Sequence, residues 1–220
     1  MSGEYRFSFG PWNIHEGADP FGPTVRPTIA FAEKLGMYKK LGFDAVQFHD
    51  DDAVPDMEDL TPEQIVAKAG EVKKMLDGEG LVAEFVAPRL WEDPRGIDGG
   101  FTSNDSDCRQ WAIDRFKRCV DIANALDTHL IVLWLAREGT YIRESKNAIV
   151  AYQQLLDVIN EILEYDRHVE IAIEPKPNEP VDQAYVPTIG HALAVALASN
   201  DPSRVGGLIE TAHAQLAGLD

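Results

Sequence analysis

The sequence has little cysteine and no long apolar run. Cys108 and Cys119 are the only cysteines among 220 residues. If one helix holds both, as predicted below, eleven residues of spacing place them too far apart for a disulfide, so two reduced thiols are expected, as in cytosolic proteins. No stretch approaches the ~18 consecutive apolar residues of a membrane span, and the polar residues 1–6 lack the apolar core of a signal peptide. We therefore expect a cytoplasmic protein with no membrane partner.

Positive charge is also scarce. Lys and Arg number 20 against 37 Asp and Glu, which gives a formal net charge of −17. Such a chain repels the phosphates of nucleic acid, so a nucleic-acid partner is not expected. An acidic surface that favours solubility accounts for most of the charge. A minor part could belong to a cation site, because hard metal ions prefer carboxylates.

Short, nearly continuous apolar runs alternate with amphipathic segments. Such runs are typical of strands buried on both faces of a parallel sheet, and repeated βα units form a doubly wound sheet or a barrel. An eight-unit barrel needs about 250 residues, so about six units fit here. The predicted strands are residues 7–12, 45–48, 82–87, 130–134, 169–173 and 205–209. The predicted helices are residues 27–41, 61–76, 106–126, 146–165 and 188–199.

Three helices have a predicted inward face. The clearest is 61–76, where Thr61 and Gln64 form a capping box around Pro62, and Gly78 and Gly80 end the helix. Its inward residues are Ile65, Ala69, Val72 and Leu76, those of 106–126 are Phe116, Cys119, Val120 and Ala123, and those of 146–165 are Ile149, Leu156, Ile159 and Leu163.

The carboxyl ends of the predicted strands collect aromatic and ionisable residues. In βα folds the working residues lie at these ends. Each residue alone has a structural explanation, but together they favour an active site. In chain order they are Trp12, the run His49-Asp50-Asp51-Asp52, Trp91, Trp134, Glu174, Lys176, Glu210 and His213.

His49 and the tryptophans suggest how a substrate could be held. A carboxylate beside His49 would orient the imidazole and fix its tautomer, although a capping cluster at a helix start is the simpler alternative. Trp12, Trp91 and Trp134 can be core residues, or an aromatic wall that shields a substrate from water.

Glu174, Lys176, Glu210 and His213 suggest a metal centre. An ionised pair at a strand end costs desolvation energy unless it has a task. Glu174 could bind a divalent cation, while Lys176 could hold a substrate oxygen. If Glu210 is the last residue of its strand, Glu210 and His213 can face one metal, and this donor set suits Mg, Mn or Co. The alternative is a surface turn with scattered charge.

Several ordered motifs resemble those of the xylose isomerase family, and the match extends over the whole chain. The longest, residues 172–180 (AIEPKPNEP), is highly specific. The others are residues 9–12 (FGPW), 19–22 (DPFG), 48–52 (FHDDD), 99–105 (GGFTSND), 132–134 (VLW), 137–139 (REG), 187–192 (PTIGHA) and 210–213 (ETAH). The resemblance implies a TIM-barrel-type α/β fold with about six of its eight βα units, in a single incomplete domain over residues 1–220.

The resemblance also implies a chemistry. It is a metal-assisted hydride shift between C2 and C1 of a sugar, interconverting D-xylose and D-xylulose, and D-glucose and D-fructose. Two divalent cations, Mg, Mn or Co, stabilise the developing charge. Glu174 and Glu210 match ligands of the first metal, Glu210 bridges to the second, and His213 matches a ligand of the second.

The remaining implied roles concern the sugar. His49 matches the residue at the ring oxygen and Asp52 the residue that orients it, a pair assigned to ring opening. Lys176 matches the lysine on the carbonyl oxygen. Trp12 and Trp134 match residues lining the pocket. Phe21 matches a phenylalanine inserted by a neighbouring subunit, so a homo-oligomer, a dimer or tetramer, is expected.

The chain also departs from the family pattern. Residues 87–91 (APRLW) replace a Thr-Thr-Asn-Leu-Phe stretch, Leu135 and Ala136 replace two glycines, His15-Glu16 replaces Gly-Trp, and Ala214 replaces a carboxylate. The aspartate ligands of the seventh and eighth strands have no counterpart before Asp220, so we expect poor turnover by these 220 residues alone. Two alternatives remain open: another sugar isomerase or epimerase, or a truncated homologue that binds sugar or metal without catalysis.

Overall fold

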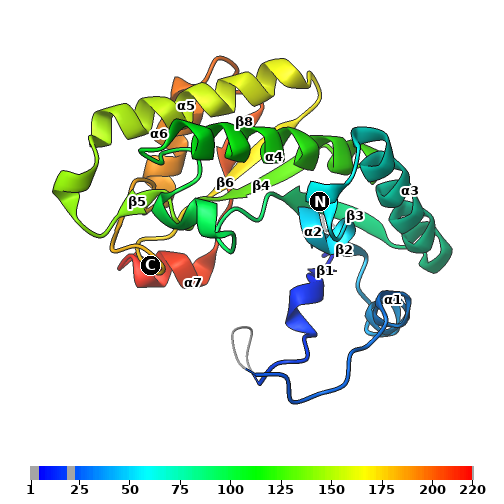
Figure 1. Ribbon diagram of the computed structural model, residues 1–220. Coiled ribbons are helices and arrows are strands. Elements are labelled where there is room, and N and C mark those ends of the chain that lie inside the picture. Colours follow the sequence, from blue (N-terminus) through cyan, green and yellow to red (C-terminus); the bar gives the residue numbers. More distant parts are fainter. Residues whose placement is uncertain (1–4, 19–22, 220) are drawn as a thin grey trace. The chain divides into compact units, whose positions relative to one another are not determined.

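The structure, a computed structural model, describes residues 5–18 and 23–219 (Figure 1). Two compact units divide the chain. The first is Met1–Val86 with Asp121–Thr128, and the second is Ala87–Val120 with His129–Asp220. Within the described ranges, no helix is long and apolar enough to cross a membrane.

The first unit is a short βα arrangement. Strands β1 and β2 are parallel, with Ser8 opposite Ala45 and Phe9 opposite Val46, and β3 follows β2 in the sheet. Helix α1 packs against α3. The elements are β1 (Ser8–Phe9), α1 (Phe31–Lys40), β2 (Ala45–His49), α2 (Asp50–Ala53), α3 (Pro62–Glu79) and β3 (Val82–Ala87).

Helix α3 confirms the capping prediction. Thr61 Oγ1 accepts a hydrogen bond from Gln64 N at 3.3 Å, and Gln64 Oε1 accepts one from Thr61 N at 2.8 Å, so two amide groups of the first turn are satisfied. All four predicted inward residues are buried. Gly80 ends the helix with φ at +66°, a left-handed conformation that glycine adopts without steric cost. Gly78 lies inside the helix and does not end it.

The second unit contains three parallel strands in the order β4-β6-β8. The bounds are α4 (Ser106–Ala125), β4 (Leu130–Trp134), β5 (Gly139–Thr140), α5 (Ala148–Tyr165), β6 (Glu170–Glu174), β7 (Gln183–Ala184), α6 (Ile189–Ala198), β8 (Val205–Gly207) and α7 (Thr211–Leu216). The last residues of α4 belong to the first unit. Lys117 of α4 forms an ion pair with Glu161 of α5 at 2.6 Å, and these helices run side by side (Figure 1).

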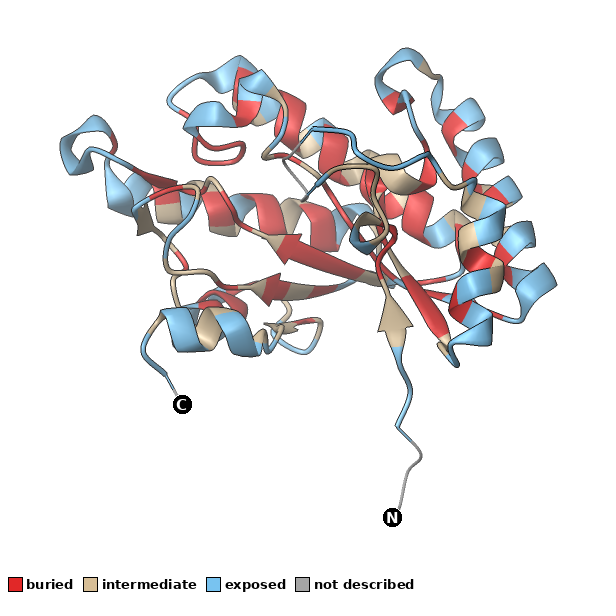
Figure 2. Cartoon of the chain, turned by 90° about the horizontal axis from the view of Figure 1, so that it is seen from below, coloured by how far each residue is buried: buried red, intermediate tan, exposed pale blue. Residues whose placement is uncertain are grey.

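The core lies where strands and inward helix faces meet, and Figure 2 shows buried residues along both. Ile131 and Leu133 of β4, and Ile171 and Ile173 of β6, are almost completely buried. Their alternate neighbours on β6, Glu170, Ala172 and Glu174, are more exposed, because successive side chains of a strand point to opposite faces. The second unit therefore has one packed face and one face that carries Glu174.

Helix α6 packs very closely on β8. A Cβ atom at Gly207 would lie 2.3 Å from Ile189 Cδ1 and 3.7 Å from Ala192 Cβ. Glycine at this position therefore allows the strand and helix to approach.

Each of the six predicted strands and five predicted helices has a counterpart in the structure, but several details differ. The strand expected at residues 7–12 is limited to Ser8–Phe9, and the 3₁₀ helix Pro11–Asn13 follows it. The antiparallel pair of β5 with β7 and the helix α7 were not predicted. The strand expected at residues 205–209 ends at Gly207. On α5, Ile149 is exposed and Leu156 only half-buried, whereas Ala151, Leu155, Val158, Ile159, Ile162 and Leu163 are buried. The predicted face was wrong at Ile149 because that residue lies in the first turn, beyond the packed part of the helix.

This corrected face can be tested with two substitutions of the same type. Ile159 is fully buried and Ile149 is 82% exposed. We expect Ile159→Ala to lower the free energy of unfolding by about 2–5 kcal/mol, because it removes buried atoms and leaves a cavity. Ile149→Ala should change it by no more than about 0.5 kcal/mol. Urea denaturation measures both, and equal effects would contradict the assignment.

Candidate active site

In the first unit, the end of β2 brings His49 and Asp52 together. His49 is the last residue of β2, and α2 begins at the next residue. Asp52 Oδ2 accepts a hydrogen bond from His49 N at 3.0 Å and lies 2.9 Å from His49 Nδ1. The Asp52 carboxylate therefore caps the start of α2 and also lies where it can orient the His49 imidazole. With Nδ1 donating to Asp52, the other ring nitrogen, Nε2, is left as a proton acceptor.

Trp12 lies beside this histidine. The two ring centroids are 4.3 Å apart with an interplanar angle of 43°, and Trp12 belongs to the short 3₁₀ helix Pro11–Asn13 that follows β1. The aromatic ring thus covers one side of the imidazole, as expected for a wall that limits water. Phe21 lies outside the described residues, so its role stays a prediction.

In the second unit, Glu174 and His213 meet at the end of β6. Glu174 is the last residue of β6, and its Oε1 lies 3.3 Å from His213 Nδ1 on α7. The same His213 nitrogen is 3.1 Å from the carbonyl oxygen of Pro175. Glu210 is not the last residue of its strand, contrary to the premise above. It is the N-cap of α7, and its Oε1 accepts a hydrogen bond from Ala212 N at 2.9 Å.

The charges in this group perturb one another. Burial, reinforced by the negative charge of Glu210, raises the pKa of Glu174 to about 7, although Lys176 acts in the opposite direction. Burial also lowers the pKa of His213, against the effect of Glu210. A carboxyl group that resists ionisation beside another carboxylate is characteristic of sites that bind a cation or transfer a proton.

The donor chemistry of these residues fits a divalent cation. Two carboxylates and an imidazole are oxygen and nitrogen ligands that Mg, Mn, Co or Zn accept, and a cation would offset the burial and the repulsion from Glu210 that raise the pKa of Glu174. Glu174 and His213 are already adjacent. Among the described residues, however, no group of three or more His, Cys, Asp or Glu side chains is arranged to hold an ion, because the Glu210 carboxylate caps α7 instead.

Lys176 and the two remaining tryptophans form a second part of this region. Lys176 Nζ lies 5.7 Å from the ring centroid of Trp134, and the Trp134 and Trp91 centroids are 4.4 Å apart in an edge-to-face arrangement. Lys176 Nζ is also 3.5 Å from Glu179 Oε2. The Trp134 Nε1 atom is buried, and none of the described atoms accepts its hydrogen bond. A buried donor of this kind favours a bound hydroxyl or an ordered water.

Sequence reasoning quoted residues 137–139 as a motif but gave them no role. Glu138 is 3% exposed, and its carboxylate accepts four hydrogen bonds from residues 100–102. Arg137 Nε donates to the carbonyl oxygen of Trp91 at 2.8 Å. The available signal was a charged pair, Arg137 and Glu138, three and four residues beyond a buried strand, where an unpaired charge is costly.

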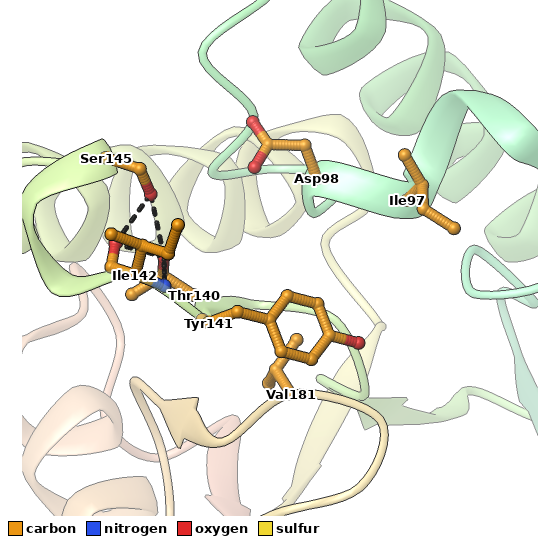
Figure 3. Close-up of a pocket in the computed structure, with 8 residues that line it drawn as sticks. Ile97, Asp98, Thr140, Tyr141, Ile142, Ser145 and Val181 are labelled. Carbon is orange, nitrogen blue, oxygen red and sulfur yellow. Dashed lines mark hydrogen bonds between the residues drawn. The ribbon is translucent and has the colours of Figure 1, made fainter.

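Two of the cavities in the second unit bear on the placement of the predicted site residues. One, of about 140 Å³, is shown in Figure 3. It contains none of the predicted site residues, and its lining is Ile97, Asp98, Gly139, Thr140, Tyr141, Ile142, Ser145 and Val181. The other, of about 170 Å³, is mostly apolar and touches Glu210, His213 and Pro175. The candidate ligands therefore border an apolar cavity.

The sequence matches one family model, described as "Xylose isomerase-like TIM barrel", over residues 35–220. The chain belongs to this family. Its fold is therefore the TIM-barrel-type α/β fold, as the motifs implied, with parallel strands and helices in the described units. The resemblance to the xylose isomerase family is confirmed at this level.

Solved structures of similar fold agree with this xylose isomerase-like assignment. D-psicose 3-epimerase from Clostridium cellulolyticum H10, solved with D-tagatose, has a TM-score of 0.70 at 14% identity, covering 96% of this chain and 65% of the epimerase. The IOLI protein, solved with a zinc atom, has a TM-score of 0.69 at 16% identity, with 98% and 66% covered. A protein of Sinorhizobium meliloti 1021 has a TM-score of 0.59 at 27% identity, with 84% and 60% covered. The chain thus spans less than two thirds of each.

The raised pKa of Glu174 predicts how stability depends on pH when divalent cations are removed with a chelator. The unfolded group has its ordinary pKa of 4.5, and the folded group about 7. The folded state therefore binds the proton more tightly, and its stability falls as the pH rises from about 4.5 through 7. Because a tenfold change in proton affinity corresponds to about 1.4 kcal/mol, the loss is about 3 kcal/mol.

Glu174→Gln should abolish this part of the pH dependence. The variant should equal the wild type in stability near pH 4.5 and exceed it at pH 8, with urea denaturation as the measurement. Parallel stability curves for the two proteins across this range would show that Glu174 ionises normally.

Proposed function

We propose that this chain is a metal-dependent aldose–ketose isomerase, with D-xylose and D-xylulose as its first substrate pair and D-glucose and D-fructose as its second. The observation that carries the proposal is the contact between Glu174 and His213, next to Lys176, at the carboxyl end of β6 in a member of the xylose isomerase-like family. In barrels of this class, chemistry takes place at that end of the strands.

Glu174, Glu210 and His213 are the residues that would hold the cations, two ions of Mg, Mn or Co. When bound, such ions act as Lewis acids and polarise the oxygens of the sugar. Turning the Glu210 carboxylate away from Ala212 N would add it to the pair already formed by Glu174 and His213. The charge of Glu210 already influences Glu174, so the three side chains belong to one electrostatic group.

His49 and Asp52 are assigned to ring opening. Opening a cyclic sugar removes a proton from the anomeric hydroxyl and delivers one to the ring oxygen, which becomes a hydroxyl. His49 can move such a proton at Nε2, because Asp52 holds Nδ1 at 2.9 Å and stabilises the imidazolium that forms.

Lys176 is assigned to the carbonyl oxygen of the open-chain sugar. Its ammonium group donates hydrogen bonds and places positive charge where negative charge develops during the hydride shift. Trp91 and Trp134 lie beside it, and Trp134 Nε1 offers an unused donor to a sugar hydroxyl. The tryptophans exclude water from the reacting carbons.

A second candidate is epimerisation of a ketose on the same type of barrel. The similarity to a D-psicose 3-epimerase solved with D-tagatose favours it, as does the replacement of the usual Thr-Thr-Asn-Leu-Phe stretch by residues 87–91. Zinc in the IOLI structure makes Zn a metal to test. Product analysis separates the two: isomerisation converts D-xylose to D-xylulose, whereas epimerisation converts D-fructose to D-psicose.

The isomerase proposal predicts the effect of Lys176→Met. With Mg, Mn, Co and Zn supplied in turn, the full chain should form D-xylulose from D-xylose slowly, in line with the poor turnover expected above, with at least one metal. Lys176→Met should lower kcat by about 100-fold or more, because one well-placed electrostatic contact is lost.

Lys117→Met is the matched control. Lys117 pairs with Glu161 on the surface of the second unit, away from the strand ends, so this variant should keep the wild-type rate. Equal rates for wild type and Lys176→Met would refute the role of Lys176. Formation of D-psicose without D-xylulose would replace the proposed reaction by the second candidate.

We also propose that the chain acts as a homo-oligomer, a dimer or tetramer. Exposed apolar side chains on α6 and next to β8, namely Leu193, Leu197 and Ile209, favour association. Sedimentation equilibrium should give a mass of two or four chains. A mass of one chain throughout the concentration range would contradict the proposal.

A further inference from the structure

The carboxylate of Glu138 is buried, and the hydrogen bonds that hold it come from uncharged donors. Three consecutive amides donate to it: Gly100 N at 2.9 Å, Phe101 N at 3.0 Å and Thr102 N at 2.9 Å. Thr102 Oγ1 donates a fourth bond at 2.5 Å. Burying a charged group costs several kcal/mol unless it is fully hydrogen-bonded, so this arrangement fixes the backbone of residues 100–102 around one side chain.

The backbone of this loop is adapted to that approach. Gly99 has φ at +87°, and a Cβ there would lie 3.0 Å from Glu138 Oε2. At Gly100 a Cβ would lie 3.3 Å from Glu138 Oε1. Two glycines therefore let the amides close on the carboxylate.

The Glu138 carboxylate and the tryptophan pair border the same small cavity. A small cavity of about 10 Å³ is bounded by Glu138, Trp91, Trp134, Phe101 and Arg137. Glu138 lies four residues beyond Trp134, and its neighbour Arg137 holds the carbonyl oxygen of Trp91 at 2.8 Å. The segment 134–138 therefore carries Trp134 and is tied to the backbone of Trp91, and the hydrogen bonds of Glu138 fix it to the loop 100–102.

We propose that Glu138 is a positioning residue for the sugar-binding wall, because it fixes the edge-to-face geometry of Trp91 and Trp134. This rests on the proposed function in so far as the wall binds sugar. Without the four hydrogen bonds, segment 134–138 is released from loop 100–102, and the two rings lose their fixed angle of 70° at 4.4 Å. A displaced wall binds the sugar less well and admits water to the reacting carbons, so kcat/KM should fall.

The test begins with circular dichroism, which needs no activity. Two indoles this close couple their electronic transitions and give a pair of bands of opposite sign, and Trp91→Phe identifies that pair by removing it. Glu138→Ala should lose most of the signal. Glu138→Gln, which keeps the volume but only one acceptor oxygen, should lose part of it. If Glu138→Ala does not fold, Glu138→Gln and Thr102→Ala, which removes one donor, serve instead.

Asn104→Ala is the matched control, because Asn104 Nδ2 ties the same loop to the carbonyl oxygen of Ser145 at 3.1 Å without touching either ring. It should keep the couplet. In the D-xylose assay, Glu138→Gln should lower kcat/KM by about 10- to 100-fold, whereas Asn104→Ala should leave kcat/KM unchanged.

A wild-type couplet in folded Glu138→Ala and Glu138→Gln would overturn the inference, as would its equal loss in Asn104→Ala. If the wild type converts no sugar, the proposed function fails, and the dichroism still decides the role of Glu138.

Discussion

The parallel pairing of β4 with β6 is the constraint on which the candidate site of the second unit depends. Five residue pairs are in register, from Leu130 opposite Glu170 to Trp134 opposite Glu174. Because β4 and β6 end in register, Trp134, the last residue of β4, lies opposite Glu174, the last residue of β6. A shift by one residue would send every side chain of a strand to the opposite face, so burial of Ile131, Leu133, Ile171 and Ile173 also fixes where Trp134 and Glu174 point.

Glu138 and Glu174 are carboxylates of this unit that are shielded from water, and the rest of the chain compensates their negative charges differently. Glu138 is surrounded by four donors and serves the architecture. Glu174 has a second carboxylate nearby and a raised pKa, so its ionised form lacks sufficient compensation in the chain alone. A residue of the first kind stabilises its own loop. A residue of the second kind favours a positive partner.

Much of the fold was predictable because a buried parallel strand leaves a short apolar run and an amphipathic helix leaves a period of 3.6 residues. The strand-end logic also placed His49, Trp134 and Glu174 at strand ends, and the structure has them as the last residues of β2, β4 and β6. It failed at Glu210, because the sequence does not show that β8 ends at Gly207 and that the Glu210 side chain caps α7. On α5 the abundance of apolar residues on several faces concealed which one packs. Glu138 was missed because its partners are backbone amides, which no pattern of side chains reveals.

The close approach of α6 to β8 has a consequence for reading variation in this chain. Gly207 lies three residues before Glu210, and a Cβ there would lie 2.3 Å from Ile189 Cδ1, the end of a side chain that would have to move. Gly99 is similarly restricted by its left-handed backbone and by Glu138. A saturation mutagenesis map would therefore mark Gly99 as intolerant beside residues assigned to chemistry, whereas tolerance at Gly207 depends on how far the Ile189 side chain can move. Intolerance at such positions reports the distance between a backbone and its neighbour, and only a measurement of protein abundance alongside activity separates the two causes.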